Sequence, residues 1–366
     1  MQYDELEYKP DWPQAARRLE AWWDCQIVDR AVIQVTSPRD GVERRGIPAP
    51  ASLVERWTNV EYVLEAAQEK MRTTFYGGDA FPCYWPNLGP DVFAAYLGCP
   101  IEFGEHTSWS VPIVEDWAEA PPLRLHPENP WWRLTLEMIS AAMEVAPGRF
   151  CVGLTDMHGG VDAVAALRDP QNLAMDLVEH PEEVKRAVDD LIPVWFDAYE
   201  GQRRLINPKV PGTTTWLTAW TAGKCYPVSC DFICMISPAM FKEFVLKDLI
   251  AETQWLDRSV FHLDGPGALR HLDALLEIPK LHAIQWVPGS KVPAEPMTRW
   301  VPLLRKIQDA GRALHLSVTP DEVEPLMREL RPEGLLLQTS CDAEDEARAL
   351  VRKVEELTPE RKSFPV

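Results

Sequence analysis

Two imidazole–carboxylate pairs are spaced so that each lies on one side of an extended segment. His262 and Asp264 are two positions apart, as are Asp156 and His158, and alternate residues of a strand point to the same face. Such a pair can bind one metal ion or exchange a proton with one substrate group. We predict that both pairs belong to a functional site; the alternative is that they are hydrogen-bonded polar groups of the core or of a turn.

Cys341 is the third candidate metal ligand. It follows a β-rich run near the end of the chain, where its thiolate would join His262 and Asp264 in a three-ligand zinc site with an open fourth position. The chain has eight cysteines but no C-x2-C pair, so buried free thiols are expected rather than a disulfide framework. Cys341 as a buried small residue is therefore the alternative.

Further polar and aromatic residues accompany these candidates. Asp231, beside Cys230, would face a substrate or cap the following helix, and we group it with Asp156 and His158 as a predicted acid–base set. The side chains predicted to shape a substrate pocket are Trp216, Trp220, Tyr226, Gln285 and Trp286.

The second half of the chain repeats a unit made of a short β-rich run, a turn and an amphipathic helix. Strands are predicted at 213–220, 260–264, 281–287, 313–318 and 334–339, and helices at about 238–256, 266–277, 297–310, 320–330 and 343–357. This alternation implies a parallel sheet with right-handed crossovers.

The first half gives fewer clear elements. Strands are predicted at 31–36 and 150–155, one or two helices at 171–204, and long loops in the Pro-, Gly- and Trp-rich stretches 37–50 and 76–130. Seven strands with one hidden in the Pro-rich region favour an α/β fold, a (β/α)8 TIM barrel, over a doubly wound open sheet. We expect one domain over 1–366, elaborated at about 1–130, with its chemistry at the carboxyl ends of the strands.

Charge and hydropathy exclude several classes of protein. With 37 basic and 56 acidic side chains the net charge is −19, which disfavours nucleic-acid binding. No apolar run is long enough to span a membrane, and the acidic start of the chain is unlike a signal peptide, so a cytoplasmic protein is expected. Motifs of dinucleotide, P-loop and serine-hydrolase sites are absent from the sequence.

Two stretches carry a family resemblance. YPVSCDFICMISPAMFKEFVLKDL (226–249) and FHLDGPGALRHLDALLEIPKLHAIQWVPG (261–289) resemble the uroporphyrinogen decarboxylase-like superfamily. The likeness covers roughly 150–357, with a looser match at 75–90, and is nearer the corrinoid-dependent methyltransferases. The decarboxylases carry an Arg-rich segment near the amino terminus, and 1–50 holds nothing equivalent.

The resemblance implies a site and a reaction. Methyltransferases of this branch bind zinc through His-x-Cys on one strand and a later Cys, which here correspond to His262-Leu263-Asp264 and Cys341. Asp in place of Cys departs from the pattern and leaves iron, manganese or no metal open. The resemblance implies methyl transfer from a small methylated donor to a corrinoid carried by a partner protein, and pairing of the chain into a homodimer.

Two alternatives remain open from the sequence. One is a carboxy-lyase of the same fold that uses Asp156 as a proton relay on a small carboxylated substrate. The other is a non-catalytic barrel that binds a small ligand and needs no metal.

Overall fold

The computed structural model describes residues 4–206, 210, 212–289 and 295–362 of the chain. Its strands are β1 (Val32–Pro38), β2 (Thr74–Gly78), β3 (Cys83–Tyr84), β4 (Ile101–Phe103), β5 (Ser108–Ser110), β6 (Cys151–Val152), β7 (Cys225–Ser229), β8 (Arg258–Asp264), β9 (Ala283–Val287), β10 (Ala313–Ser317) and β11 (Leu335–Ser340).

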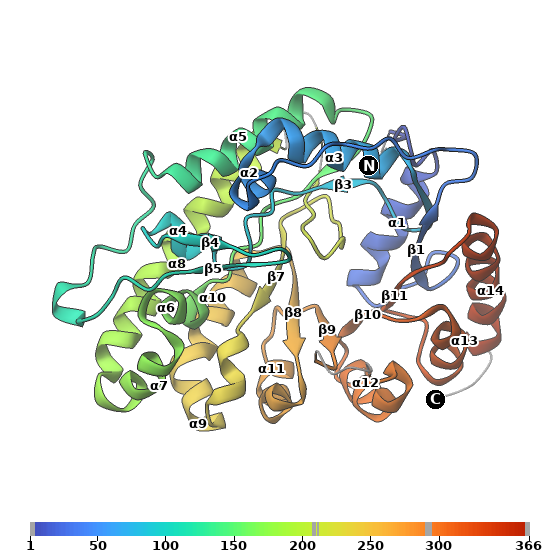
Figure 1. Ribbon diagram of the computed structural model, residues 1–366. Helices are drawn as coiled ribbons and strands as arrows, with labels where there is room; N and C mark the ends of the chain where they lie inside the picture. The colour runs from blue at the N-terminus through green and yellow to red at the C-terminus, as the bar shows by residue number, and fades with distance from the viewer. Residues whose placement is uncertain (1–3, 207–209, 211, 290–294, 363–366) are drawn as a thin grey trace.

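Helices surround these strands (Figure 1). They are α1 (Trp12–Trp23), α2 (Leu53–Thr58), α3 (Val60–Arg72), α4 (Val92–Tyr96), α5 (Pro130–Val145), α6 (Gly160–Arg168), α7 (Pro170–Glu179), α8 (Pro181–Ile206), α9 (Pro238–Met240), α10 (Leu246–Trp255), α11 (Leu272–Leu276), α12 (Val301–Asp309), α13 (Pro320–Glu329) and α14 (Glu344–Lys362). Within the described residues, no helix combines the length and apolar character that crossing a bilayer requires.

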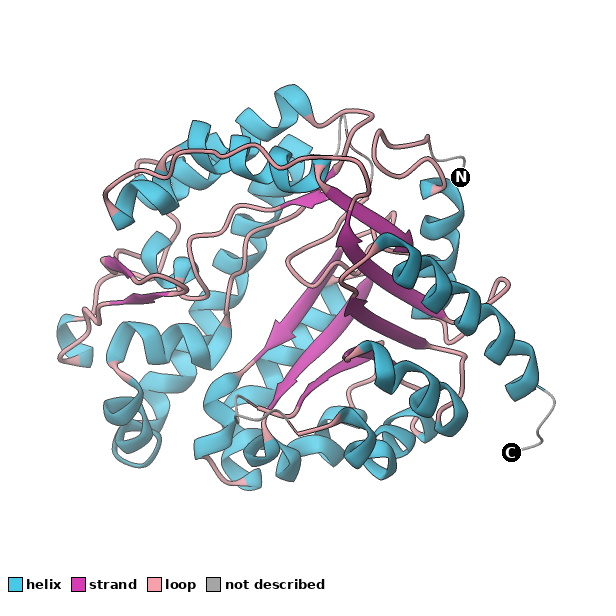
Figure 2. Ribbon diagram, turned by 45° about the vertical axis from the view of Figure 1, so that its right-hand side comes forward, coloured by secondary structure: helices cyan, strands magenta, loops and turns pink. Residues whose placement is uncertain are grey.

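Seven strands form one sheet in the order β2-β1-β11-β10-β9-β8-β7, and every neighbouring pair is parallel except β1 and β2. Figure 2 shows this sheet with helices packed along its outside. The strands β3 and β6 form a separate parallel pair. The α/β class is thereby confirmed. Among the described residues no ladder joins β7 to that pair, so the closed eight-stranded barrel stays a prediction.

The predicted strand at 213–220 is wrong. This segment is a loop, and the strand lies later, at Cys225–Ser229. Two of its threonines bond to the local backbone: Thr214 Oγ1 donates to Ala219 O, and Thr215 Oγ1 accepts from Leu217 N–H. Such local bonds compete with strand pairing. The true strand contains Pro227, which fits its position at an edge of the seven-stranded sheet.

The other predicted elements fare better. The strands predicted at 260–264, 281–287, 313–318 and 334–339 correspond to β8 to β11, and 31–36 corresponds to β1. The predicted strand at 150–155 shortens to β6, and the segment 171–204 forms the two helices α7 and α8. The Pro-rich stretch 76–130 holds more structure than loops alone, including β3, α4 and the β4–β5 hairpin.

Helix α1 covers the amino ends of the strands. Its apolar face packs against one small or apolar residue from each of six strands: Val32, Cys225, Val260, Ala283, Ala313 and Leu336. The Trp22 indole Nε1 donates to Leu314 O at 3.1 Å and to Gly334 O at 3.0 Å. This end of the sheet is therefore filled by side chains, which leaves the carboxyl end for a site.

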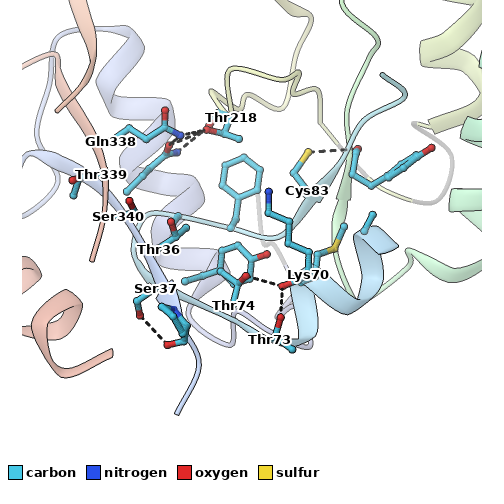
Figure 3. A pocket seen from close by; sticks show the side chains of 18 of the residues that line it. Thr36, Ser37, Lys70, Thr73, Thr74, Cys83, Thr218, Gln338, Thr339 and Ser340 are labelled. Carbon is cyan, nitrogen blue, oxygen red and sulfur yellow. Dashed lines mark hydrogen bonds between the residues drawn. The ribbon is translucent and has the colours of Figure 1, made fainter. Parts of the chain in front are cut away.

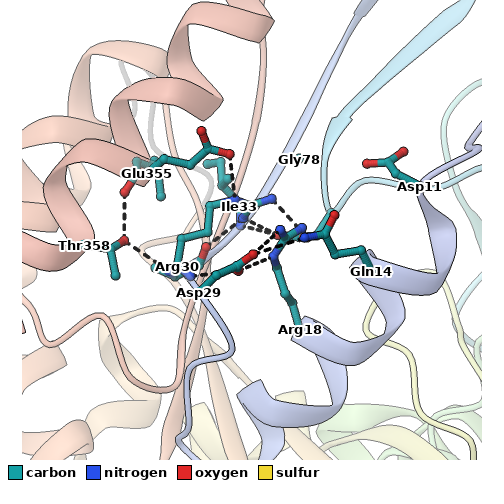
Figure 4. A network of polar contacts seen from close by, with 12 residues as sticks. Asp11, Gln14, Arg18, Asp29, Arg30, Ile33, Gly78, Glu355 and Thr358 are labelled. Atoms are coloured by element: carbon teal, nitrogen blue, oxygen red, sulfur yellow. Dashed lines mark hydrogen bonds and ion pairs between the residues drawn. The ribbon is translucent and has the colours of Figure 1, made fainter. Parts of the chain in front are cut away.

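A buried charge network ties α1 to β1 (Figure 4). Asp79, which follows β2 and is fully buried, accepts bonds from Arg18 Nη1 at 3.1 Å, Arg30 Nη1 at 2.5 Å and Ile33 N–H at 3.0 Å. Arg18 also forms a bidentate pair with Asp29: its Nε and Nη2 each donate to one carboxylate oxygen at 2.6 Å. The two buried guanidinium groups thus have charged partners.

A polar layer lies above the apolar end. Register aligns Gln34 of β1 with Gln338 of β11, and His262 of β8 with Gln285 of β9. The loop 212–222 reaches this layer from inside, because Thr218 O accepts from Gln34 Nε2 at 2.9 Å and Thr218 Oγ1 accepts from Gln338 Nε2 at 3.0 Å. These contacts form the floor of the space at the carboxyl ends of the strands.

Candidate active site

His158 lies between two carboxylates. Its Nε2 is 3.6 Å from Asp156 Oδ1, and its Nδ1 is 3.4 Å from Asp162 Oδ2. Burial alone would lower the pKa of this imidazole, but Asp156 and Asp162 raise the pKa to about 10. His158 therefore carries a proton on each ring nitrogen at neutral pH, which fits the acid or orienting role predicted for it.

Asp162 was missed by the sequence reasoning. It lies in the first turn of α6, four residues after His158, and its carboxylate also accepts the backbone N–H groups of Asp231 at 2.8 Å and Phe232 at 3.0 Å. Burial would raise the pKa of Asp162, but His158 and these two donors lower it. The signal available in the sequence was the position of Asp162, four residues after His158 and in the first turn of a helix.

A second cluster joins Asp231, His262 and Asp264. One ligand-type atom from each residue lies within 4.8 Å of the other two, a spacing that suits a metal ion. His262 and Asp264 share the inner face of β8, and Asp231 begins the short turn η2 (Asp231–Met235) after β7. The residue that the structure brings close to His262 and Asp264 is thus Asp231, and not Cys341.

Gln285 fixes the orientation of His262. Its Oε1 is 2.6 Å from His262 Nδ1, so Nδ1 donates this bond and Nε2 is the ring nitrogen that this contact leaves available. The Trp216 ring stands edge-on to the imidazole with centroids 5.4 Å apart. A histidine whose other nitrogen is held by an amide oxygen is typical of metal ligands.

Asp231 also belongs to a group with His158 and Asp162 in which ligand-type atoms are equally close. That group suits a metal less well, because both nitrogens of His158 face carboxylates and hold protons. Although part of Asp231 is exposed, burial of its carboxyl group and the charge of Asp162 raise its pKa, while His158 and His262 oppose this. Cation binding at Asp231 would relieve that repulsion.

Asp156 faces the same space. Burial raises the pKa of its carboxyl group, while His158, His262 and the Trp216 indole lower it in part. The Trp216 Nε1 itself is buried without a hydrogen-bond partner of ordinary length among the described residues. Asp156, His158 and Trp216 therefore lie close to His262.

Cys341 lies apart from both clusters. It is buried at the end of β11 and lines a different cavity, together with Thr36, Gln338 and Trp216. Burial and the charges of Glu346 and Asp342 raise the pKa of its thiol, which disfavours a thiolate ligand. The structure therefore does not bring Cys341 to His262 and Asp264 within the described residues.

Three predicted pocket aromatics lie elsewhere. Trp286 follows Gln285 directly, so it points to the opposite face of β9, where it packs on Trp300. Trp220 is buried near the amino end of the sheet beside Trp12. Tyr226 is also buried, and its contact with the site is through the backbone on either side of Asp156.

The Tyr226 hydroxyl donates to Thr155 O at 2.6 Å and accepts the Met157 N–H at 2.5 Å. These two residues flank Asp156. Tyr226 therefore holds the backbone that carries Asp156 and His158, although its ring faces the outer core rather than a substrate.

Two buried carboxyl groups of α10 lie next to the two glycines that follow His158. Asp248 and Glu252 are one turn apart on α10, and burial raises the pKa of Asp248 to about 7 and that of Glu252 well above its usual range. They fit against the Gly159–Gly160 pair: Gly160 has φ +49, and a Cβ there would lie 1.9 Å from Asp248 Oδ2. The glycines thus permit close packing against carboxyl groups.

Two cavities flank the clusters. The acidic cavity, about 400 Å³, is lined by His158, Asp162 and Asp231 and by apolar residues such as Trp109 and Met235. The large cavity, about 760 Å³, lies over the Gln34–Thr218–Gln338 floor (Figure 3). Trp216 lines the large cavity and contacts His262, so it stands between that cavity and the cluster of Asp231, His262 and Asp264.

Comparisons with known proteins bear on the fold. No protein-family model and no curated protein matches the sequence. Among solved structures, the fold is similar to a methyltransferase from Methanosarcina mazei, with a TM-score of 0.60 at 13% identity, over 93% of this chain and 98% of that chain. At this identity the likeness shows a shared fold, and the family resemblance in the sequence stays a prediction.

Proposed function

We propose that this protein is a methyltransferase that moves a methyl group from a small methylated donor to a reduced corrinoid on a partner protein. The observation that carries the proposal is the convergence of the Asp231–His262–Asp264 cluster with the proton-bearing His158. The shared fold with a methyltransferase and the sequence resemblance support the choice of reaction.

Asp231, His262 and Asp264 would hold the metal. Two carboxylate oxygens and one imidazole nitrogen suit zinc, and they suit iron(II) and manganese(II) as well. A bound ion would act as a Lewis acid on the heteroatom that carries the methyl group. Gln285 keeps the free nitrogen of His262 directed at this position.

His158 would supply the proton that the leaving group needs. When the bond between the methyl carbon and the donor heteroatom breaks, the bond electrons stay on the heteroatom, and a proton from the imidazolium neutralises it. The corrinoid provides the electron pair for the new bond to carbon. Asp156 and Asp162 keep His158 protonated and fix its ring.

The test measures metal content and methyl transfer together. Wild type, His262→Ala and Cys341→Ala are assayed for bound metal and for methylation of cob(I)alamin, offered with methoxyaromatic, methylamine and betaine donors. We expect transfer from at least one donor by the wild type and by Cys341→Ala, and loss of both metal and transfer in His262→Ala. A corrinoid that stays unmethylated with every donor would overturn the proposal.

A carboxy-lyase is the second candidate, and the pair of Asp156 and His158 favours it. A decarboxylation leaves the bonding electrons on carbon, and a buried acid beside that carbon would protonate it. The raised pKa values of Asp156 and His158 suit this role. Release of CO2 from a small carboxylate without any corrinoid would favour the lyase, whereas ligand binding that survives His262→Ala without turnover would indicate a non-catalytic barrel.

A further inference from the structure

The two cavities beside the cluster differ in charge. The aspartates that line the acidic cavity are Asp91, Asp162, Asp169 and Asp231. His158 is the only basic group among the described residues that line it. The described residues that line the large cavity include no acidic side chain at all, but two basic ones, Lys70 and Arg44. In a chain with a net charge of −19, a cavity without acidic residues is exceptional.

The two cations of the large cavity are not neutralised by the protein. Lys70 lies in the last turn of α3 and extends towards the cavity (Figure 3), and Arg44 lies on the loop after β1. Both are exposed, and neither has an ion-pair partner among the described residues. By contrast, Arg45 and Arg72 nearby are both paired with Glu69.

Part of the wall of the large cavity is apolar and aromatic. Its walls include Met71, Tyr76, Phe81, Trp85 and Trp216. Rings of this kind stack on a flat apolar ligand, and about 760 Å³ is ample for one aromatic ring with substituents.

The polar floor of the cavity is neutral and already bonded. Thr218 accepts from both Gln34 and Gln338, and its hydroxyl lies 3.0 Å from Gln34 Oε1. The floor therefore offers no charge of its own, and Lys70 and Arg44 are the charged side chains among the described residues that line the cavity.

From this arrangement we infer that the large cavity binds an aromatic carboxylate, whose carboxylate pairs with Lys70 and Arg44 and whose ring lies among the aromatic walls. Trp216 lines the same cavity and contacts His262, so the end of the ring that carries the methylated heteroatom would lie against Trp216. The inference rests on the proposed function, because it identifies the methyl donor as an aromatic acid with its methylated heteroatom far from the carboxylate.

Binding of two matched probes tests the inference. Titration calorimetry compares 4-methoxybenzoate with the neutral 4-methoxybenzyl alcohol on the wild type, Lys70→Gln, Arg44→Gln and the double variant. We expect each single variant to weaken binding of the acid by about two- to fivefold, the usual range for an exposed ion pair, and to leave the alcohol unchanged. The double variant should show the product of the two effects.

Two exposed cations far from the cavity serve as matched controls. Lys242→Gln and Arg17→Gln remove the same charges from η3 (Phe241–Val245) and from α1 and should leave binding of both probes unchanged. If the wild type does not bind the acid, or if the cavity variants weaken acid and alcohol alike, the inference is wrong.

The binding assay needs neither metal nor corrinoid, which separates the two proposals. Binding that depends on Lys70 and Arg44 without any methyl transfer would leave the cavity assignment standing and remove the methyltransferase. Methyl transfer from a donor without a carboxylate, with KM unchanged in Lys70→Gln and Arg44→Gln, would do the reverse.

Discussion

The carboxylate of Asp162 accepts the backbone N–H of Asp231 at 2.8 Å, although the two residues are 69 positions apart in the chain. The same oxygen, Oδ2, lies 3.4 Å from His158 Nδ1. One side chain thereby fixes both the proton-bearing imidazole and the backbone of a candidate metal ligand. The geometry of the two clusters is coupled through Asp162.

Asp162→Asn should lower the pKa of His158, because the imidazolium loses one of the two carboxylates that stabilise it. Proton NMR titration of the histidine rings measures this change. The free energy of unfolding in urea should fall by about 1–3 kcal/mol, because an amide replaces the charged acceptor of two backbone N–H groups. Asp273→Asn, on an exposed residue, is the control; an unchanged His158 pKa in Asp162→Asn would contradict the assignment.

Gln285→Leu should weaken zinc binding by about 10–100-fold, the range typical when the group that orients a ligating histidine is lost. The reason is that His262 Nδ1 loses its acceptor, so the ring is no longer held with Nε2 towards Asp231 and Asp264. Competition with a chromogenic chelator gives the affinity. Cys341→Ser should bind zinc like the wild type, and a loss there comparable to that of Gln285→Leu would count against the proposed ligand set.

Asp248→Asn should change how stability depends on pH. Burial raises the pKa of Asp248 from 3.8 to about 7 in the folded protein. The stability that the protonated carboxyl group contributes to the fold is therefore full below about pH 4 and is lost as the pH rises through 7. An amide cannot ionise and escapes this loss. Thermal unfolding should therefore show the variant gaining on the wild type between pH 5 and pH 8; parallel pH profiles would refute the buried ionisation.

Asp79→Ala should destabilise the fold by about 3–5 kcal/mol, because it leaves the buried guanidinium groups of Arg18 and Arg30 without their shared partner. Urea unfolding measures the change. Glu355→Gln removes an exposed contact, 3.7 Å from Arg30 Nε, and should cost less than about 1 kcal/mol. Equal losses in the two variants would show that Asp79 is not the centre of the network.

The sequence predicted the elements that follow a regular period. Strands β8 to β11 alternate apolar outward and polar inward residues, and their helices are amphipathic, so both were recognisable. The same periodicity predicted that His262 and Asp264 share one face of their strand, as β8 has them. It also contained the reason why Trp286 points away, since adjacent residues of a strand alternate.

The remaining parts depend on contacts that periodicity does not encode. Residues 213–220 have a strong strand composition, yet the hydroxyl groups of Thr214 and Thr215 bond to nearby backbone and the segment becomes a loop. The pairing of Asp231 with His262 depends on how the turn after β7 meets β8, and the role of Asp162 depends on a contact across 69 positions. Cys341 was favoured by its position after the last strand and by the spacing of the family pattern, and neither encodes the distance from Cys341 to His262 in the folded chain.

The floor of the large cavity also determines when this site can form. Thr218 joins Gln34 and Gln338, which lie 304 positions apart, so the floor needs an early strand, a central loop and a late strand together. Contacts this distant in sequence form slowly and late in folding. A chain still emerging from the ribosome would therefore lack the binding cavity until β11 has docked, and ligand would reach only fully assembled molecules.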